Sequence, residues 1–204
     1  MAKVLVAFSG GVESTAVLHH MVQTHGASNV RALYVCKRED ENNIVGIDKL
    51  YRAEKHYTKL IAQHYGVTLT TVERDFVDGT SSIPRYSPHL WSQEALALCL
   101  IDRDFTELAS GLHAGEQPAG HALLIQDYFL KVMEHEGLSV QRTRPLSHLT
   151  KKQQWDMIPD QVKSWVWYCV NYQSRQVVSG QTTSFTRCGA CAKCQEFDTL
   201  VGTM

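Results

Sequence analysis

An apolar run that ends in two glycines, close to the start of the chain, is the feature that most constrains the fold. Residues 3–8 read KVLVAF, and Gly10 and Gly11 follow directly after Ser9. The run is too short for a buried helix and predicts a strand that is covered on both faces. The glycines permit positive φ angles and leave the backbone open to a ligand. Residues 14–22 then carry apolar side chains at helical spacing, so the predicted order is strand, glycine turn and helix.

This turn is a candidate anion site, because a helix N-terminus presents free backbone N–H groups and the positive end of the helix dipole. The turn also leaves the carboxyl end of a predicted central strand, where open α/β sheets bind ligands. Neither a GxxxxGK(S/T) nor a GxGxxG pattern is present, and an ordinary turn is the alternative interpretation. Flanking serines add hydroxyl donors, and the candidate nucleotide-binding residues of the turn are Ser9, Gly10, Gly11, Val12, Glu13, Ser14 and Thr15.

The segments that follow alternate between strand and helix. Residues 30–35, 67–72 and 105–111 form apolar or β-branched runs, and amphipathic stretches lie between them. This order predicts parallel strands joined by right-handed crossovers, and therefore an α/β fold. Residues 140–146 are expected to form an edge strand that ends at Pro145.

The composition fits one domain with a small appendage. A chain of 204 residues accommodates a nucleotide-binding α/β domain over residues 1–160 and a helical, cysteine-rich segment over residues 161–204. The formal charge of −1 does not favour direct binding to nucleic acid, which normally selects a basic surface. The sequence shows no N-terminal signal and no apolar run near the ~18 residues of a membrane span. We therefore expect a soluble, cytoplasmic protein with no membrane partner.

Two further segments carry candidate ligand groups. The run over residues 105–111 ends in Gly111, and His113 and Glu116 follow it. If this run is a neighbouring strand, its turn lines the same site as the first glycine turn. Arg85 lies in a loop with little periodicity, where a guanidinium can bind phosphate or carboxylate bidentately. For both segments, an ordinary polar loop is the alternative.

Three cysteines stand at CxxCxxC spacing near the C-terminus. One tight turn over Cys188, Cys191 and Cys194 can aim three thiols at one point, and Cys169 supplies a fourth. Four thiolates suit a tetrahedral structural Zn²⁺ site, which is the favoured interpretation. An iron–sulfur cluster also takes four thiolates and is the alternative.

Residues 9–14, SGGVES, resemble the SGGxDS loop of the PP-loop ATP pyrophosphatase superfamily. In that superfamily the loop holds the pyrophosphate part of ATP while a substrate oxygen is adenylated. Glu13 stands where the family has Asp. Together with the cysteines, residues 144–151 (RPLSHLTK) and 167–169 (WYC) make the chain similar to the 7-cyano-7-deazaguanine synthase branch. Residues 113–116 fall where that branch has an NAxD-like turn.

The resemblance implies a Rossmann-like parallel sheet of the adenine nucleotide alpha hydrolase type, with flanking helices and a C-terminal zinc-binding segment. It implies conversion of 7-carboxy-7-deazaguanine, ammonia and ATP to 7-cyano-7-deazaguanine through adenylated intermediates, in the biosynthesis of queuosine-type nucleosides. Its cofactors would be ATP, Mg²⁺ and Zn²⁺, and it would form a homodimer. The implied catalytic residues are Glu13, Lys151 and Arg85. Gly111 and His113 would join the residues of the glycine turn in the nucleotide site. The implied zinc ligands are Cys169, Cys188, Cys191 and Cys194.

Three other functions stay open at this stage. The first is a diverged amide-forming enzyme that acts on another deazapurine or carboxylate. The second is a sulfur-transfer enzyme, which needs a reactive thiol near the glycine turn. The third is a nucleotide-binding or partner-binding module without catalysis, and Glu13 in place of Asp motivates this interpretation.

Overall fold

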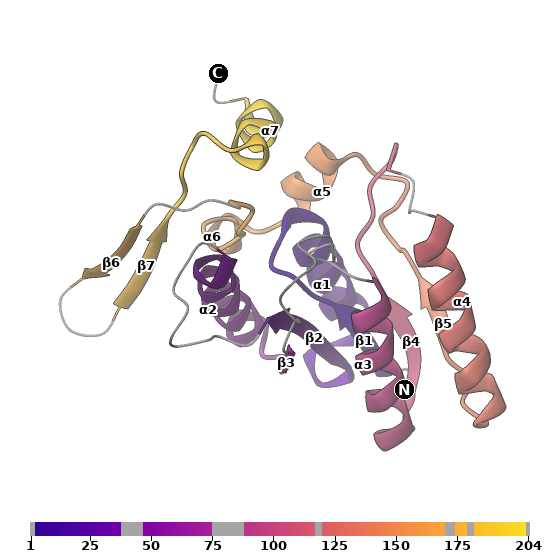
Figure 1. The fold of residues 1–204 in the computed structure, drawn as a ribbon. Helices are drawn as coiled ribbons and strands as arrows, with labels where there is room; N and C mark the ends of the chain where they lie inside the picture. The colour runs from indigo at the N-terminus through magenta and orange to yellow at the C-terminus, as the bar shows by residue number, and fades with distance from the viewer. Residues whose placement is uncertain are drawn as a thin grey trace.

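Five parallel strands form the central sheet, in the order β3-β2-β1-β4-β5 (Figure 1). The structure is a computed structural model that describes residues 3–37, 47–74, 88–116, 120–169, 174–178 and 182–202. The sheet confirms the predicted α/β fold class and the edge position of the segment 140–146. Its strands are β1 (Lys3–Ala7), β2 (Val30–Lys37), β3 (Thr68–Arg74), β4 (Phe105–Ala109) and β5 (Gln141–Thr143).

β1 occupies the centre of the sheet because its side chains are apolar on both faces. Val4, Leu5 and Val6 are fully buried, and the strand pairs with β2 on one side and β4 on the other. Val4 and Val6 pack into one hydrophobic cluster and Leu5 into a second one on the opposite face. A strand with this pattern needs a layer of helices on each face of the sheet.

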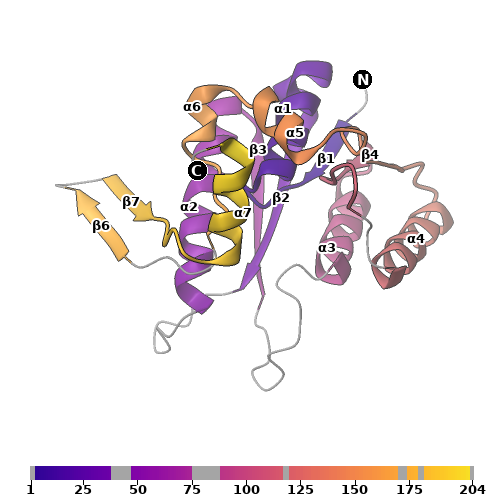
Figure 2. The ribbon, with the colours of Figure 1, turned by 90° about the horizontal axis from the view of Figure 1, so that it is seen from above.

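The helices provide these two layers (Figure 2). The core on the face of Val4 receives α1 (Val12–His25), α2 (Ile47–Tyr65), α5 (Lys151–Met157) and α6 (Asp160–Lys163), and η1 (Ala27–Asn29) leads from α1 into β2. The core on the face of Leu5 receives α3 (Pro88–Ile101) and α4 (Gly120–His135). No helix in the described ranges has both the length and the apolar composition of a membrane span.

The C-terminal segment contains a hairpin that the sequence analysis does not predict. β6 (Ser174–Val178) and β7 (Thr182–Thr186) pair antiparallel and project away from the central sheet, and α7 (Ala192–Val201) follows (Figure 1). The Tyr57 ring stacks on Trp167 with centroids 5.1 Å apart, and its hydroxyl contacts the backbone N and O of Phe185 at 3.3 Å each. These contacts anchor the end of β7 to α2.

Candidate functional site

Two loops meet where the strand order of the sheet reverses. From β1 the chain builds outward through β2 and β3, and β4 then returns to the other side of β1. The loop after β1 and the loop after β4 therefore leave the carboxyl edge of the sheet at neighbouring positions. This point is the usual ligand position in open parallel α/β sheets.

The two glycines of the first loop differ in backbone conformation. Gly10 has a φ of +76°, and a Cβ built there would lie 3.0 Å from Thr58 Cγ2. Its carbonyl accepts a hydrogen bond from the backbone N–H of Trp167 at 2.9 Å. Gly11 has an ordinary extended backbone and is the N-cap of α1. Only Gly10 therefore requires glycine for its backbone conformation.

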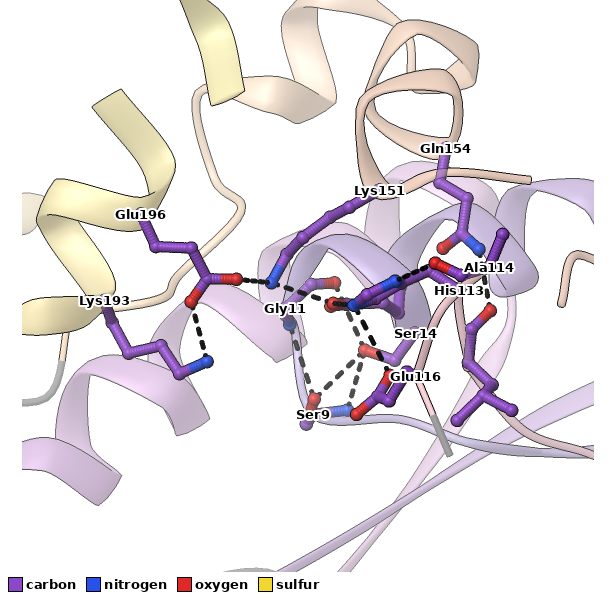
Figure 3. A network of polar contacts seen from close by, with 12 residues as sticks. Ser9, Gly11, Ser14, His113, Ala114, Glu116, Lys151, Gln154, Lys193 and Glu196 are labelled. Carbon is purple, nitrogen blue, oxygen red and sulfur yellow. Dashed lines mark hydrogen bonds and ion pairs between the residues drawn. The ribbon is translucent and has the colours of Figure 1, made fainter. Parts of the chain in front are cut away.

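Ser9 and Ser14 hold the loop in shape through bonds within the loop. The two hydroxyls lie 3.1 Å apart, the N–H of Ser9 donates to Ser14 Oγ, and Ser14 Oγ donates to the carbonyl of Gly11 (Figure 3). Gly11 provides no side-chain cap for α1, and the first helical bond runs from the N–H of Thr15 to the carbonyl of Gly11. The N–H groups of Val12, Glu13 and Ser14 therefore have no intrahelical acceptor and can bind an anion.

The second loop packs directly on the first turn of α1 through Gly111. A Cβ built at Gly111 would lie 2.8 Å from the carbonyl carbon of Glu13 and 2.9 Å from the backbone N of Ser14. This contact has room only for glycine. The structure thus brings both predicted glycine turns to one place.

Lys151, the first residue of α5, lies between two carboxylates (Figure 3). Its Nζ is 2.9 Å from Glu13 Oε1 and 2.6 Å from Glu196 Oε1. Burial opposes the charge of Lys151, but Glu13 and Glu196 outweigh this and raise the pKa of the ammonium above its ordinary value. Partial desolvation also opposes the charge of Glu196, but hydrogen bonds from Lys151 and Lys193 lower its pKa to about 2. A charged lysine is therefore fixed against Glu13, a residue of the first turn of α1.

His113 and Glu116 complete a small cluster with Glu13. His113 Nε2 lies 4.0 Å from Glu13 Oε1 and 3.6 Å from Glu116 Oε2, while its Nδ1 lies 2.9 Å from the carbonyl oxygen of Ala114. One ligand atom from each of the three residues falls within 4.8 Å of the others. Carboxylate and imidazole groups at this spacing can hold a divalent cation.

Sequence reasoning missed Gln154 and Glu196. The amide nitrogen of the fully buried Gln154 donates to the carbonyls of Leu112 and Leu146 at 2.7 and 2.9 Å, which joins the second loop to the segment after β5 (Figure 3). A glutamine or glutamate on a short amphipathic helix carries no signal that separates such a role from solvent exposure. Arg85, a predicted site residue, lies outside the described residues.

The four predicted metal-ligand cysteines converge at one point. Their sulfur atoms all lie within 4.8 Å of one another, and Cys169 and Cys194 are buried. The backbone N–H groups of Cys188 and Cys191 donate to the sulfurs of Cys169 and Cys188, each at 3.3 Å. Four thiolates around one Zn²⁺ have sulfur–sulfur separations of ~3.8 Å, given Zn–S bonds of about 2.3 Å. The group therefore fits a metal centre after a small contraction.

Comparisons with known proteins give a likeness to solved structures alone. No protein-family model and no curated protein matches the chain. Among solved structures it is similar to the U34-tRNA thiolase NcsA from Methanococcus maripaludis, determined with its 4Fe-4S cluster, at 14% sequence identity and a TM-score of 0.48. The match covers 99% of this chain and 65% of the thiolase chain. By its own strand order and loops, the chain is a parallel α/β protein with a candidate anion site at the switch point and a four-cysteine candidate metal centre.

Proposed function

We propose that this chain is an ATP-dependent enzyme of the PP-loop type that adenylates a carboxylate, and that its product is 7-cyano-7-deazaguanine. The main support is the loop over residues 9–14, where α1 begins with free amides and the carboxylate of Glu13 in its first turn binds the ammonium of Lys151. Backbone amides and a lysine together suit the phosphates of a nucleotide. The likeness of this loop to SGGxDS is the second support.

The reaction is an activation followed by a displacement. A carboxylate is a poor electrophile, so an oxygen of 7-carboxy-7-deazaguanine attacks the α-phosphate of ATP, pyrophosphate leaves and an acyl adenylate forms. Ammonia then displaces AMP and gives the amide. The amide oxygen then attacks the α-phosphate of a second ATP, pyrophosphate leaves, and loss of AMP and protons from the adenylated amide gives the nitrile. The free amides of α1 and Lys151 bind the departing pyrophosphate, where fixed donors stabilise developing charge.

Glu13 has two partners in this proposal. In the structure, its carboxylate oxygen Oε1 lies 2.9 Å from Lys151 Nζ. When phosphates bind Lys151, the carboxylates of Glu13 and Glu116 become available to hold Mg²⁺, which takes oxygen ligands, and Mg²⁺ bound there would neutralise phosphate charge. Glutamate supplies the same carboxylate as the family's aspartate, one methylene further from the backbone.

The four cysteines would hold one structural Zn²⁺. The close spacing of the sulfurs supports a single ion, because a 4Fe-4S cluster inserts several metal atoms between the thiolates and spreads them further apart. A thiol bound in such a centre is not available to attack a substrate, which disfavours sulfur transfer. Zinc here would supply no catalytic step and would order the C-terminal segment.

The experiment is mass spectrometry of the purified protein incubated with ATP, Mg²⁺, ammonium and 7-carboxy-7-deazaguanine. The proposal expects the nitrile base together with AMP. If the amide accumulates alone, the enzyme stops after the first activation, and if ATP binds but stays intact, the binding-module function replaces the proposal.

A parallel Glu13→Asp variant separates the causes of low activity: a large gain means that Glu13 has weakened catalysis, and a loss means that the site is adapted to glutamate.

A further inference from the structure

Glu196 lies outside the glycine loop and contacts the lysine of the candidate nucleotide site. Its Oε1 is 2.6 Å from Lys151 Nζ, and the same Nζ is 2.9 Å from Glu13 Oε1. The Lys151 side chain is long and flexible, and ordering such a side chain costs rotamer entropy when a ligand binds. A contact that orders Lys151 in advance therefore favours the binding of a ligand to its ammonium.

Two buried residues fix α7 on either side of Glu196. Cys194 belongs to the cysteine cluster, and Phe197 packs into the larger hydrophobic core. The Phe197 ring stands edge-on to the ring of Trp155 on α5, with centroids 4.7 Å apart. Trp155 lies one turn after Lys151 on the same helix, so the two are neighbours along α5. The contact that joins α5 to α7 thus sets the place of Glu196 relative to Lys151.

The second oxygen of Glu196 has a partner of its own. Lys193, three residues earlier on α7, places its Nζ 2.9 Å from Glu196 Oε2. The Lys193 side chain is 54% exposed, whereas that of Lys151 is 18% exposed. Lys193 therefore neutralises the carboxylate from the solvent side, while Oε1 is left for Lys151 (Figure 3).

The two carboxylates at Lys151 differ in what a phosphate does to them. A phosphate that binds the Lys151 ammonium competes with Glu13, because both are anions and Glu13 lies in the first turn of α1. Glu196 reaches Lys151 from α7, so it can stay bound when Glu13 is displaced. A lysine with Glu13 as its single partner would lose its restraint at the moment when the phosphate arrives.

An ordinary ion pair at the surface is the alternative interpretation. Glu196 is 43% exposed on its side chain, and exposed pairs of lysine and glutamate contribute little to stability. Such a pair would change the stability slightly and would leave ATP binding unchanged. The two interpretations therefore differ in a measurable quantity, the affinity for ATP.

We propose that Glu196 is a positioning residue of the nucleotide site, which holds the Lys151 ammonium in place while phosphates replace Glu13 as its second partner. The inference deepens the proposed function and rests on it for the identity of the ligand, ATP. Glu196 contacts no phosphate in this arrangement and acts through Lys151 alone. The C-terminal segment then takes part in nucleotide binding as well as in the cysteine cluster.

The test is a double-mutant cycle on the affinity for ATP, measured by titration calorimetry. Glu196→Gln should weaken ATP binding by ~5-fold, the upper end for an ion pair of this exposure. In the Lys151→Met background, Glu196→Gln should change the affinity by less than ~2-fold, because no ammonium is left to position. Glu134→Gln is the matched control, since Glu134 is an exposed carboxylate in the last turn of α4 and should leave the affinity unchanged.

A spectroscopic signal separates positioning from a general effect on the fold. The ammonium groups of lysines give ¹H–¹⁵N NMR signals, and the signal that is missing in Lys151→Met belongs to Lys151. This signal should shift or broaden in Glu196→Gln and stay unchanged in Glu134→Gln. Circular dichroism melting checks that each variant folds.

Three outcomes overturn the inference: unchanged or tighter ATP binding in Glu196→Gln, an equal effect of this substitution with and without Lys151, or an unchanged Lys151 signal. Tighter binding would mean that Glu196 acts on the phosphates only as a repelling charge. The nitrile assay separates this inference from the proposed function. ATP binding that depends on both residues without nitrile formation keeps the positioning role and refutes the proposed product. Nitrile formation with additive effects of the two substitutions does the reverse.

Discussion

Replacing Gly111 by alanine tests how the two loops of the site fit together. The added Cβ would lie 2.8 Å from the carbonyl carbon of Glu13, 2.9 Å from Glu13 Cβ and 2.9 Å from the backbone N of Ser14. These neighbours include the backbone of the first turn of α1, which cannot rotate away as a side-chain tip can. Gly111 does not have a positive φ, so the effect of Gly111→Ala is steric and not conformational.

The size of the effect follows from the missing space. Ordinary carbon contacts begin near ~3.5 Å, so the second loop or α1 must move by roughly 0.5–1 Å. Overpacking of this kind costs about 1–3 kcal/mol of stability. For a domain of this size, this corresponds to a fall in Tm of about 2–12 °C. Because Ser14 carries one of the free amides, the displacement should also weaken ATP binding by about tenfold, a loss of ~1.4 kcal/mol.

Gly11→Ala is the matched control in the same site. Gly11 has a φ of −76° as the N-cap of α1, and the nearest atom to its built Cβ is Ser9 Oγ at an ordinary 3.5 Å. The free energy of unfolding of the Gly11→Ala variant should differ from that of the unchanged protein by no more than about 1 kcal/mol. Urea unfolding and ATP titration calorimetry measure both variants. Equal stability of Gly111→Ala and Gly11→Ala would refute the close contact between the two loops.

Three shorter predictions concern charge, metal and pH. Lys151→Met should weaken ATP binding by ~10-fold or more, measured by calorimetry. Lys152→Met is the control: it loses only an exposed ion pair with Asp156 and should leave ATP binding unchanged. Purified protein should contain one zinc and no iron per chain by elemental analysis, and Cys169→Ser should lose the metal and lower the Tm. Burial, and then the charges of His20 and His64, lower the pKa of His19 below 6.5. The unfolded chain therefore binds the proton more readily than the folded chain, and stability falls as the pH drops below 6.5. Urea unfolding between pH 7.5 and 5 should therefore show a fall in stability that is smaller in His19→Gln, and an unchanged slope would contradict this assignment.

The sequence predicts the sheet because each strand depends on local pattern alone. Residues 3–8 contain no polar side chain beyond Lys3, and a run of this kind can only be buried on both faces. In the structure, Thr150 is the N-cap of α5 and forms a capping box with Gln153, a local motif of the kind S/T-x-x-E/Q. Periodicity and capping are local properties, so they survive in a single sequence.

The parts that the sequence does not predict depend on contacts between distant segments. β6 and β7 carry no strong alternation that separates them from a loop, and their anchor, Tyr57, lies on α2. Gln154 and Glu196 act through partners far away in the chain, so their residue type alone says nothing of their position. The pairing of Arg142 and Arg144 at one amide oxygen required the placement of Gln126 on α4.

The C-terminal segment supports the glycine loop from both ends of the cysteine cluster, directly at one end and through Lys151 at the other. Trp167, two residues before Cys169, donates its backbone N–H to Gly10, and Glu196, two residues after Cys194, binds Lys151. A metal that joins Cys169 to Cys194 therefore fixes two supports of the loop at once. Without it, each support must be ordered separately, at an entropic cost for every residue between them. For this reason, loss of the metal should weaken ATP binding more than loss of the Lys151–Glu196 pair alone, as in Glu196→Gln, although neither the cysteines nor Glu196 belongs to the phosphate loop.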